Sequence, residues 1–103
     1  MAVDSILSYL AAQQRAIAVL IGHFVECESP SDDPAAVNRF VEMVADMVAP
    51  VASVKTHDGG KFGKHLVCEM QLPGPKNSGQ VLVLGHSDTV WPMGTLCLNS
   101  LFL

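Results

Sequence analysis

The most informative stretch of this sequence is Val81-Leu82-Val83-Leu84-Gly85-His86-Ser87-Asp88. Its four apolar residues, 81–84, predict a buried β-strand, because strands covered on both faces read as continuous apolar runs. His86 and Asp88 follow two residues apart, so an extended backbone places both side chains on one face. In open α/β sheets the carboxyl end of a strand borders the ligand crevice. The stretch therefore predicts an α/β fold with a functional site at its end.

His86 and Asp88 are residue types that build metal sites. A histidine binds a metal through one ring nitrogen, while a partner on the second nitrogen fixes the orientation of the ring. Asp88 can be that partner directly, by accepting the second N–H, or can orient the ring through a neighbouring residue. We therefore expect His86 to be a metal ligand and Asp88 to be the acidic residue that orients it.

With its flanks the stretch reads VLVLGHSDTVWP over residues 81–92. It resembles the first metal-binding motif of the zinc aminoacylase and glutamate carboxypeptidase family of metallopeptidases, which has acetylornithine deacetylase and succinyl-diaminopimelate desuccinylase as relatives. The shared features are the apolar strand, the small residue before His86, the Asp at plus two and the Thr-Val that follows. Glu28-Ser29-Pro30-Ser31 also resembles that family's entry into its second helix. The resemblance covers roughly the first ninety residues and breaks off near Leu96.

The resemblance implies a zinc-dependent hydrolase that cleaves amide bonds in small peptides or N-acyl amino acids. It implies His86 as the first zinc ligand and Asp88 as the catalytic carboxylate that orients a site for two zinc ions. It also implies an α/β catalytic domain with helices on both faces of a mixed sheet, carrying a smaller inserted domain that often mediates dimerisation. Trp91-Pro92 after the motif favours the glutamate carboxypeptidase branch.

The other metal ligands of that family have no counterpart in this chain. A catalytic zinc takes about three protein ligands. His23, His57 and His65 lie at a predicted helix end, a turn and a strand start, with no spacing that converges on His86. We therefore expect residues 1–96 to be the N-terminal portion of a truncated catalytic domain that is inactive as this short chain. The alternative is a non-catalytic α/β module, or a decayed gene product, in which His86 is structural.

Residues 97–103 read as an atypical tail, uncharged and apolar, with no helix cap or turn signal. A frameshift, a premature stop or a mispredicted gene end accounts for such a tail. The alternative is a genuine short tail that packs on the sheet, since an exposed apolar terminus favours aggregation.

The composition also predicts that this chain leaves part of its apolar surface unburied. The chain is 103 residues long and 50% hydrophobic, with a mean hydropathy of +0.35, whereas a small domain with much surface should be more polar. An uncovered apolar strand offers an open edge for pairing with another chain. We therefore expect the isolated chain to self-associate or to be poorly soluble.

Charge and hydropathy exclude several classes of partner. The net charge is −4 with only six Lys and Arg, which leaves no basic patch for nucleic acid. The longest apolar stretch, residues 16–21, is far shorter than the ~20 residues that span a membrane. Asp4 precedes any Lys or Arg, unlike a secretory signal, and the odd number of cysteines, Cys27, Cys68 and Cys97, indicates buried thiols without disulfides. A cytoplasmic location is the resulting expectation.

The remaining pattern predicts two helices followed by a mixed β-sheet. A first helix should start at Asp4 or Ser5 with an apolar stripe as far as Phe24, which Gln13 and Gln14 interrupt. Asp33-Pro34 should start a second helix that stops before Pro50. Strands are expected at Val51–Thr56 and Lys64–Leu72. The strand 81–84 should then pack against the apolar faces of both helices. The residues expected on those faces are Ile17, Leu20, Phe24, Phe40, Val44 and Val48.

Overall fold

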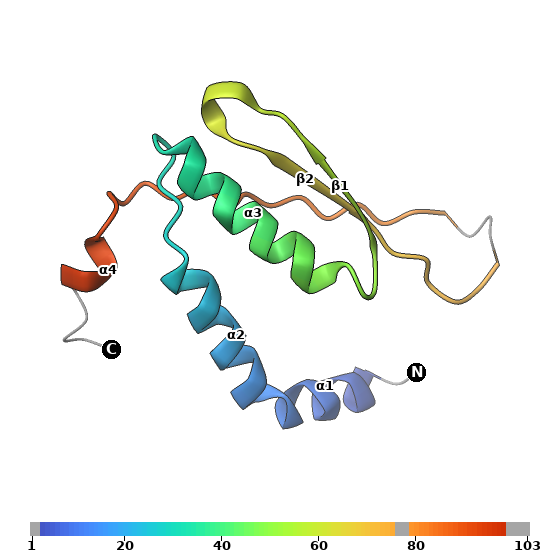
Figure 1. Cartoon of the computed structure of the whole chain (residues 1–103). Coiled ribbons are helices and arrows are strands. Elements are labelled where there is room, and N and C mark those ends of the chain that lie inside the picture. The colour runs from blue at the N-terminus through green and yellow to red at the C-terminus, as the bar shows by residue number, and fades with distance from the viewer. Residues whose placement is uncertain (1–2, 76–78, 99–103) are drawn as a thin grey trace.

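Helices and one β-hairpin form the regular structure of this chain in a computed structural model that describes residues 3–75 and 79–98 (Figure 1). The fold thus combines helices with a small antiparallel sheet, as a mixed α/β class requires, but the sheet is not the larger mixed one expected from the sequence. In chain order the elements are α1 (Val3–Ala12), α2 (Gln14–Glu26), α3 (Pro34–Val48), β1 (Ser53–His57), the 3₁₀ turn η1 (Gly60–Phe62), β2 (His65–Glu69) and α4 (Thr95–Leu98).

The first predicted helix is divided into α1 and α2 at Gln13. The N–H of Gln13 is shared between the carbonyls of Tyr9 and Leu10, at 3.2 and 3.0 Å, which tightens the last turn of α1. This is the place where polar residues interrupt the apolar stripe. Because α1 begins at Val3, Asp4 lies in its first turn rather than at its cap.

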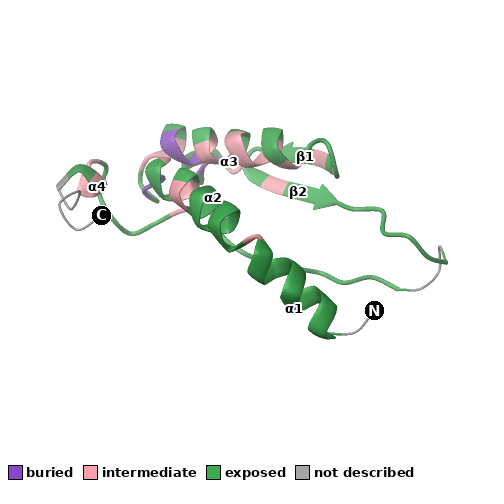
Figure 2. Cartoon of the chain, turned by 90° about the horizontal axis from the view of Figure 1, so that it is seen from below, coloured by how far each residue is buried: buried purple, intermediate pink, exposed green. Residues whose placement is uncertain are grey.

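The apolar faces of α1 and α2 are not buried, contrary to the sequence expectation. Neither helix contains a buried residue (Figure 2), and together they project as an arm from the rest of the molecule (Figure 1). The ring contact between Phe24 and Phe40, with centroids 5.7 Å apart, joins the end of this arm to α3. In the described part of the chain no helix is long and apolar enough to cross a membrane.

Helix α3 begins and ends where the sequence predicts. The Asp33 side chain accepts a hydrogen bond from the N–H of Ala36 at 3.0 Å, and Pro34 occupies the first helical position. The helix ends at Val48, two residues before Pro50. Its inner face supplies the buried apolar core of the described residues, which consists of Ala36, Val37 and Val41.

The hairpin of β1 and β2 packs against α3. Its strands pair antiparallel from Ser53 opposite Glu69 to His57 opposite His65, and both are shorter than predicted. The Asn38 side chain on α3 accepts a hydrogen bond from the Lys64 N–H at 2.8 Å. Gly63 has a φ of 83°, and a Cβ there would lie 2.7 Å from Val37 Cγ1. Only glycine allows this loop to approach the helix so closely.

The predicted strand 81–84 is absent, and this is the main correction to the sequence analysis. These four residues run as an irregular trace (Figure 1), are 74–87% exposed, and form no backbone hydrogen bond with any described residue. They therefore do not pack on the faces of α2 and α3. A β-strand forms only where a neighbouring strand binds its backbone groups. An apolar run favours burial, but it does not provide the element that would bury it.

One parallel bridge, between Pro30 and Thr89, connects the α2–α3 linker to the residues after His86. Beyond it, α4 crosses the expected boundary at Leu96, so Cys97 continues a helix that starts at Thr95. The expected tail, residues 97–103, thus includes the last two residues of α4, and residues 99–103 lie outside the described part. The thiols of Cys68 and Cys97 are exposed and Cys27 is half-buried, contrary to the expectation of buried thiols.

Candidate functional site

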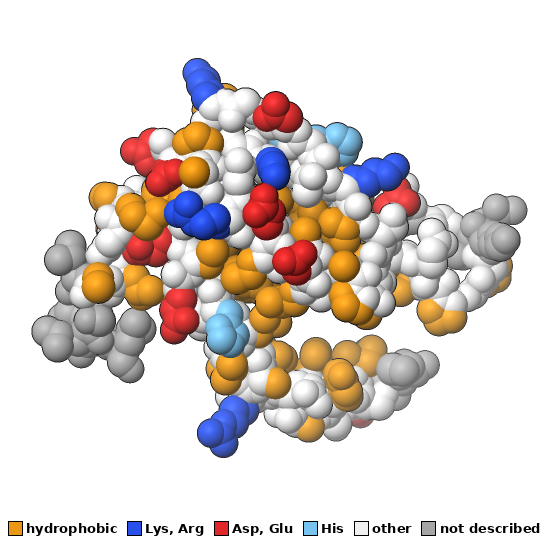
Figure 3. All heavy atoms as spheres, viewed as in Figure 1, with side chains coloured by type: hydrophobic (Ala, Val, Ile, Leu, Met, Phe, Trp, Pro, Cys, Tyr) orange, Lys and Arg blue, Asp and Glu red, His pale blue; other side chains and the backbone are white. Residues whose placement is uncertain are grey.

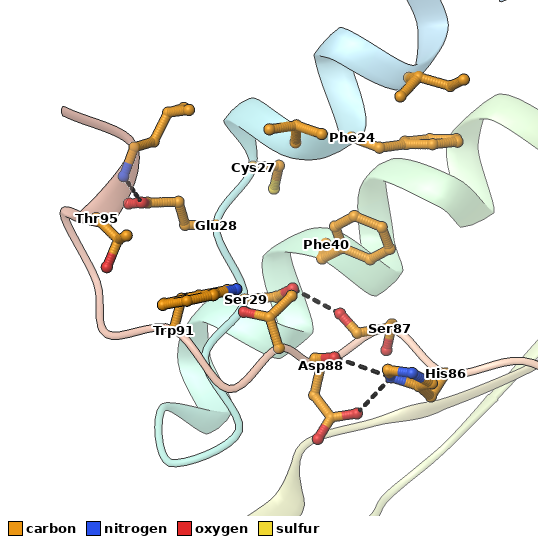
Figure 4. A pocket seen from close by; sticks show the side chains of 14 residues that line it. Phe24, Cys27, Glu28, Ser29, Phe40, His86, Ser87, Asp88, Trp91 and Thr95 are labelled. Carbon is orange, nitrogen blue, oxygen red and sulfur yellow. Dashed lines mark hydrogen bonds and ion pairs between the residues drawn. The ribbon is translucent and has the colours of Figure 1, made fainter. Parts of the chain in front are cut away.

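His86 and Asp88 contact each other as their spacing predicts. The Nδ1 atom of His86 lies 2.9 Å from the carbonyl oxygen of Asp88 and 3.2 Å from its Oδ1 (Figure 4). Both neighbours are acceptors, so Nδ1 carries the proton and donates it to them. In a neutral imidazole this leaves Nε2 with its lone pair available to a ligand. The His86 side chain is 83% exposed, so that lone pair is accessible.

The Asp88 carboxylate is held in its ionised form. Its Oδ2 accepts a hydrogen bond from the Ser31 hydroxyl at 2.7 Å. This bond is the main cause that lowers the pKa of Asp88 below its ordinary value, followed by the backbone N–H of Asp88 itself and then by His86. Desolvation opposes the change and is larger than either contribution of His86. A charged carboxylate is the form that best accepts the imidazole N–H and raises the basicity of the other nitrogen.

The segment 29–31 positions this pair from the other end of the sequence. Ser29 is 2% exposed, and its hydroxyl donates to the carbonyl of Ser87. The N–H of Thr89 donates to the carbonyl of Ser29 at 2.8 Å, and the N–H of Ser31 donates to the carbonyl of Thr89 at 2.9 Å. These bonds fix the backbone on both sides of Asp88. We call this junction, formed by residues 29–31 and 87–89, the serine clamp.

Glu28 extends the clamp to the segment that follows the motif. Its carboxylate accepts the N–H groups of Gly94, at 2.9 Å, and Leu96, at 2.8 Å, at the start of α4. The bond from Leu96 is the largest cause that lowers the pKa of Glu28, and the bond from Gly94 is the second. A carboxylate at a helix start satisfies N–H groups that have no partner inside the helix. Residues 28–31 thus hold both the motif and the residues beyond it.

Sequence reasoning did not foresee that Glu28, Ser29 and Ser31 would be residues of the site. From the sequence, residues 28–31 stood out only by their resemblance to a family's helix entry. No spacing rule predicts a contact between residues that are 57 or 58 positions apart in the chain. A signal was nevertheless present, because 28–31 and 86–89 were the two stretches that carried the family resemblance. The structure brings these two stretches into direct contact.

His86 and Asp88 stand between two hollows in the molecule. On the side of α2 and α4 lies a pocket of about 540 Å³, with aromatic and aliphatic walls that include Phe24, Phe40 and Trp91 (Figure 4). On the side of α3 and β2 lies a second hollow of about 640 Å³, lined by Val41, Val44 and Leu66 among others. A volume of this size suits a small molecule. A metal or substrate group at Nε2 would therefore have room beside it.

The metal donors within the described residues are fewer than a complete zinc site requires. His65 borders the second hollow together with His86, His57 pairs with His65 at the end of the hairpin, and His23 lies in the last turn of α2. Among residues 3–75 and 79–98, no three His, Cys, Asp or Glu side chains form a group that could hold a metal. The donor set fits one zinc ligand, Nε2 of His86, with its orienting carboxylate.

Comparisons with protein-family models, with curated proteins and with solved structures found no match for this chain. The atoms of the site itself define its chemistry. These provide an exposed imidazole nitrogen, a charged carboxylate that holds the ring, and a clamp that fixes the backbone between them.

Proposed function

We propose that this chain carries the first ligand of a zinc-dependent amidohydrolase or peptidase site, with His86 binding the metal through Nε2. The observation that supports this most is the contact of His86 Nδ1 with two oxygen atoms of Asp88, its carbonyl oxygen and its Oδ1. Metal-binding histidines usually donate their second N–H to a carboxylate or a carbonyl. Here one residue supplies both acceptors, two positions along the chain.

The chain's own residues act on the orientation and the charge of the imidazole. Asp88 holds the proton on Nδ1, and Ser31 holds the Asp88 carboxylate in place through its hydroxyl. The buried Ser29 fixes the carbonyl of Ser87, so the backbone between His86 and Asp88 keeps one shape. A bound zinc ion supplies Lewis-acid polarisation of an amide carbonyl and lowers the pKa of a bound water.

The proposed substrate class is a small peptide or an N-acyl amino acid, in the manner of a glutamate carboxypeptidase, with two zinc ions in the complete site. The described residues offer one imidazole ligand, whereas catalytic zinc takes about three protein ligands. We propose that polypeptide outside these 103 residues supplies the remaining ligands and the general base. As this chain alone, the protein is expected to show no hydrolytic activity.

A purely structural role for His86 is the competing interpretation. A structural histidine contributes by packing and by satisfied hydrogen bonds within the protein. The His86 ring uses one nitrogen in this way, but its side chain is 83% exposed. That exposure favours a ligand role over a structural one.

Zinc titration of the purified chain tests the proposal. We expect one weakly bound zinc ion per chain, because one imidazole leaves the other coordination positions to water. His86→Ala should abolish this binding, and the matched control His23→Ala should leave it unchanged. If His86→Ala binds zinc as well as the original chain, measured by calorimetry, the assignment of His86 is wrong.

A further inference from the structure

The accessible surface of this chain is too large for a compact domain of its mass. It exposes 8689 Å², whereas a folded monomer of 11.0 kDa is expected to expose about 5,600 Å². Its radius of gyration is 16.6 Å, compared with about 13 Å for a compact chain of this length. The excess of roughly 3,000 Å² per chain is larger than the total area that a standard protein interface buries.

Residues 81–84 form the most exposed continuous apolar segment of the described chain. Their exposed fractions are 87, 74, 86 and 84%, and their backbone groups form no hydrogen bond with a described residue. Hydrophobic side chains are also exposed on the arm of α1 and α2, as the space-filling view shows (Figure 3). The helical arm, however, has its backbone groups satisfied internally. Residues 81–84 lack both apolar cover and backbone partners, so they gain most from pairing.

From these observations we propose that residues 81–84 pair antiparallel with the same segment of a second copy of this chain. Around a two-fold axis Val83 then lies opposite Val83 of the second copy, and Leu82 lies opposite its Leu84. The backbone N–H and carbonyl groups of alternate residues in the ladder gain partners. The same four apolar side chains of each copy cover one another across the pair.

The absence of charged residues in and around this segment supports a second copy of the chain as its pairing partner. A two-fold axis brings identical segments together, so a charge close to the axis would lie near the like charge of the second copy. Residues 79–87 contain no Asp, Glu, Lys or Arg. Gly79 and Gly85 flank the apolar run and carry no side chain that would hinder the close approach of two backbones. The segment is therefore free of the charges and prolines that usually protect exposed strands.

This pairing leaves the two candidate metal sites separate. In the proposed register His86 lies opposite Gln80 of the second copy, so the two His86 residues are six strand positions apart, or about 20 Å. Neither copy completes the zinc site of the other. Self-association and zinc binding are consequently independent, and each is measured without the other.

Sedimentation of the purified 103-residue chain in chelator-containing buffer tests the proposal. Over about 1–100 µM protein we expect a concentration-dependent shift from monomer to dimer. The double variant Leu82→Lys, Val83→Lys places the lysines at position 83 of the two copies opposite each other and should raise the dissociation constant at least about 100-fold. Residues 81–84 are 74–87% exposed, so circular dichroism of the variant should keep the helical signal. A chain that stays monomeric at the highest concentration overturns the proposal.

Two matched controls locate the interface. Val90→Lys and Leu7→Lys replace exposed apolar side chains outside the segment and should leave the dimer intact. If either control dissociates the dimer while the double-lysine variant does not, the proposed segment is wrong. Mixing the double-lysine chain with a Leu82→Glu, Val83→Glu chain should restore a dimer that neither forms alone. Failure of this mixture to associate contradicts the proposed pairing of the two segments.

Discussion

Residues 81–84 and residues 86–89 are neighbours in the chain but differ in what surrounds them. The first group is strongly apolar, yet it is exposed and forms no backbone hydrogen bond with a described residue. The second group is mostly polar and is fixed by the serine clamp through Ser29 and Ser31. The comparison teaches that apolar character favours burial but does not fix a structure. A defined local structure also requires hydrogen-bond partners at the right positions.

The same contrast between a packed and an exposed region distinguishes α3 and its hairpin from the rest of the molecule. Gly63→Ala should give the largest loss, about 2–3 kcal/mol in the free energy of unfolding, because φ is positive and the new Cβ meets Val37. Gly85→Ala is the matched control, since a Cβ there meets nothing within 4 Å, and should change stability by less than about 0.5 kcal/mol. Urea denaturation followed by circular dichroism measures both. Equal losses in the two variants would remove the distinction between the regions.

Val41→Ala and Val83→Ala compare a buried and an exposed valine. Val41 is 2% exposed and Val83 is 86% exposed. Removing two buried carbons from Val41 should cost about 2 kcal/mol, from lost transfer energy and from the cavity left behind. Val83→Ala should be close to neutral when the protein is dilute enough to be monomeric. A loss of similar size at Val83 would show that this segment is packed in solution.

Asp33→Ala tests the local start of α3. The variant removes the hydrogen bond to the N–H of Ala36 and should cost about 1 kcal/mol. Asp32→Ala, one residue earlier and exposed, is the control and should have little effect. The measurement is again the urea midpoint, and a neutral Asp33→Ala would contradict the assigned cap.

The smallest expected effect is a pH dependence of the segment held by Glu28. Its pKa in the folded chain is lowered from 4.5 by the N–H groups of Leu96 and Gly94. The contribution is therefore present above pH 4.5 and is lost as the pH falls through the lowered pKa. Fluorescence of Trp91, the single tryptophan, should report the release of residues 94–96.

Glu28→Gln should remove this transition from the Trp91 signal, and Glu26→Gln should keep it. A transition that persists in Glu28→Gln would assign it to another group. Asp88, whose pKa is lowered from 3.8 mainly by Ser31, is the next candidate by position.

The parts of the fold that sequence predicted correctly are those whose causes lie close together in the chain. The start of α3 depends on Asp33, Pro34 and Ala36, and the contact of His86 with Asp88 depends on a spacing of two. The clamp of Ser29 with Ser87 joins residues 58 positions apart, which no local pattern encodes. The strand at 81–84 was predicted from apolar character alone, and its pairing partner was the missing information. Burial of α1 and α2 was overestimated for the same reason.

The protonation of the His86 ring is the most direct test of the proposed metal ligand. Long-range proton–nitrogen correlation by NMR near neutral pH, without metal, identifies which ring nitrogen carries the proton. The contacts with Asp88 predict a proton on Nδ1 and a bare Nε2, and Asp88→Ala should lessen this preference. A ring with its proton on Nε2 and Nδ1 bare would contradict the proposal that Asp88 prepares His86 to bind zinc.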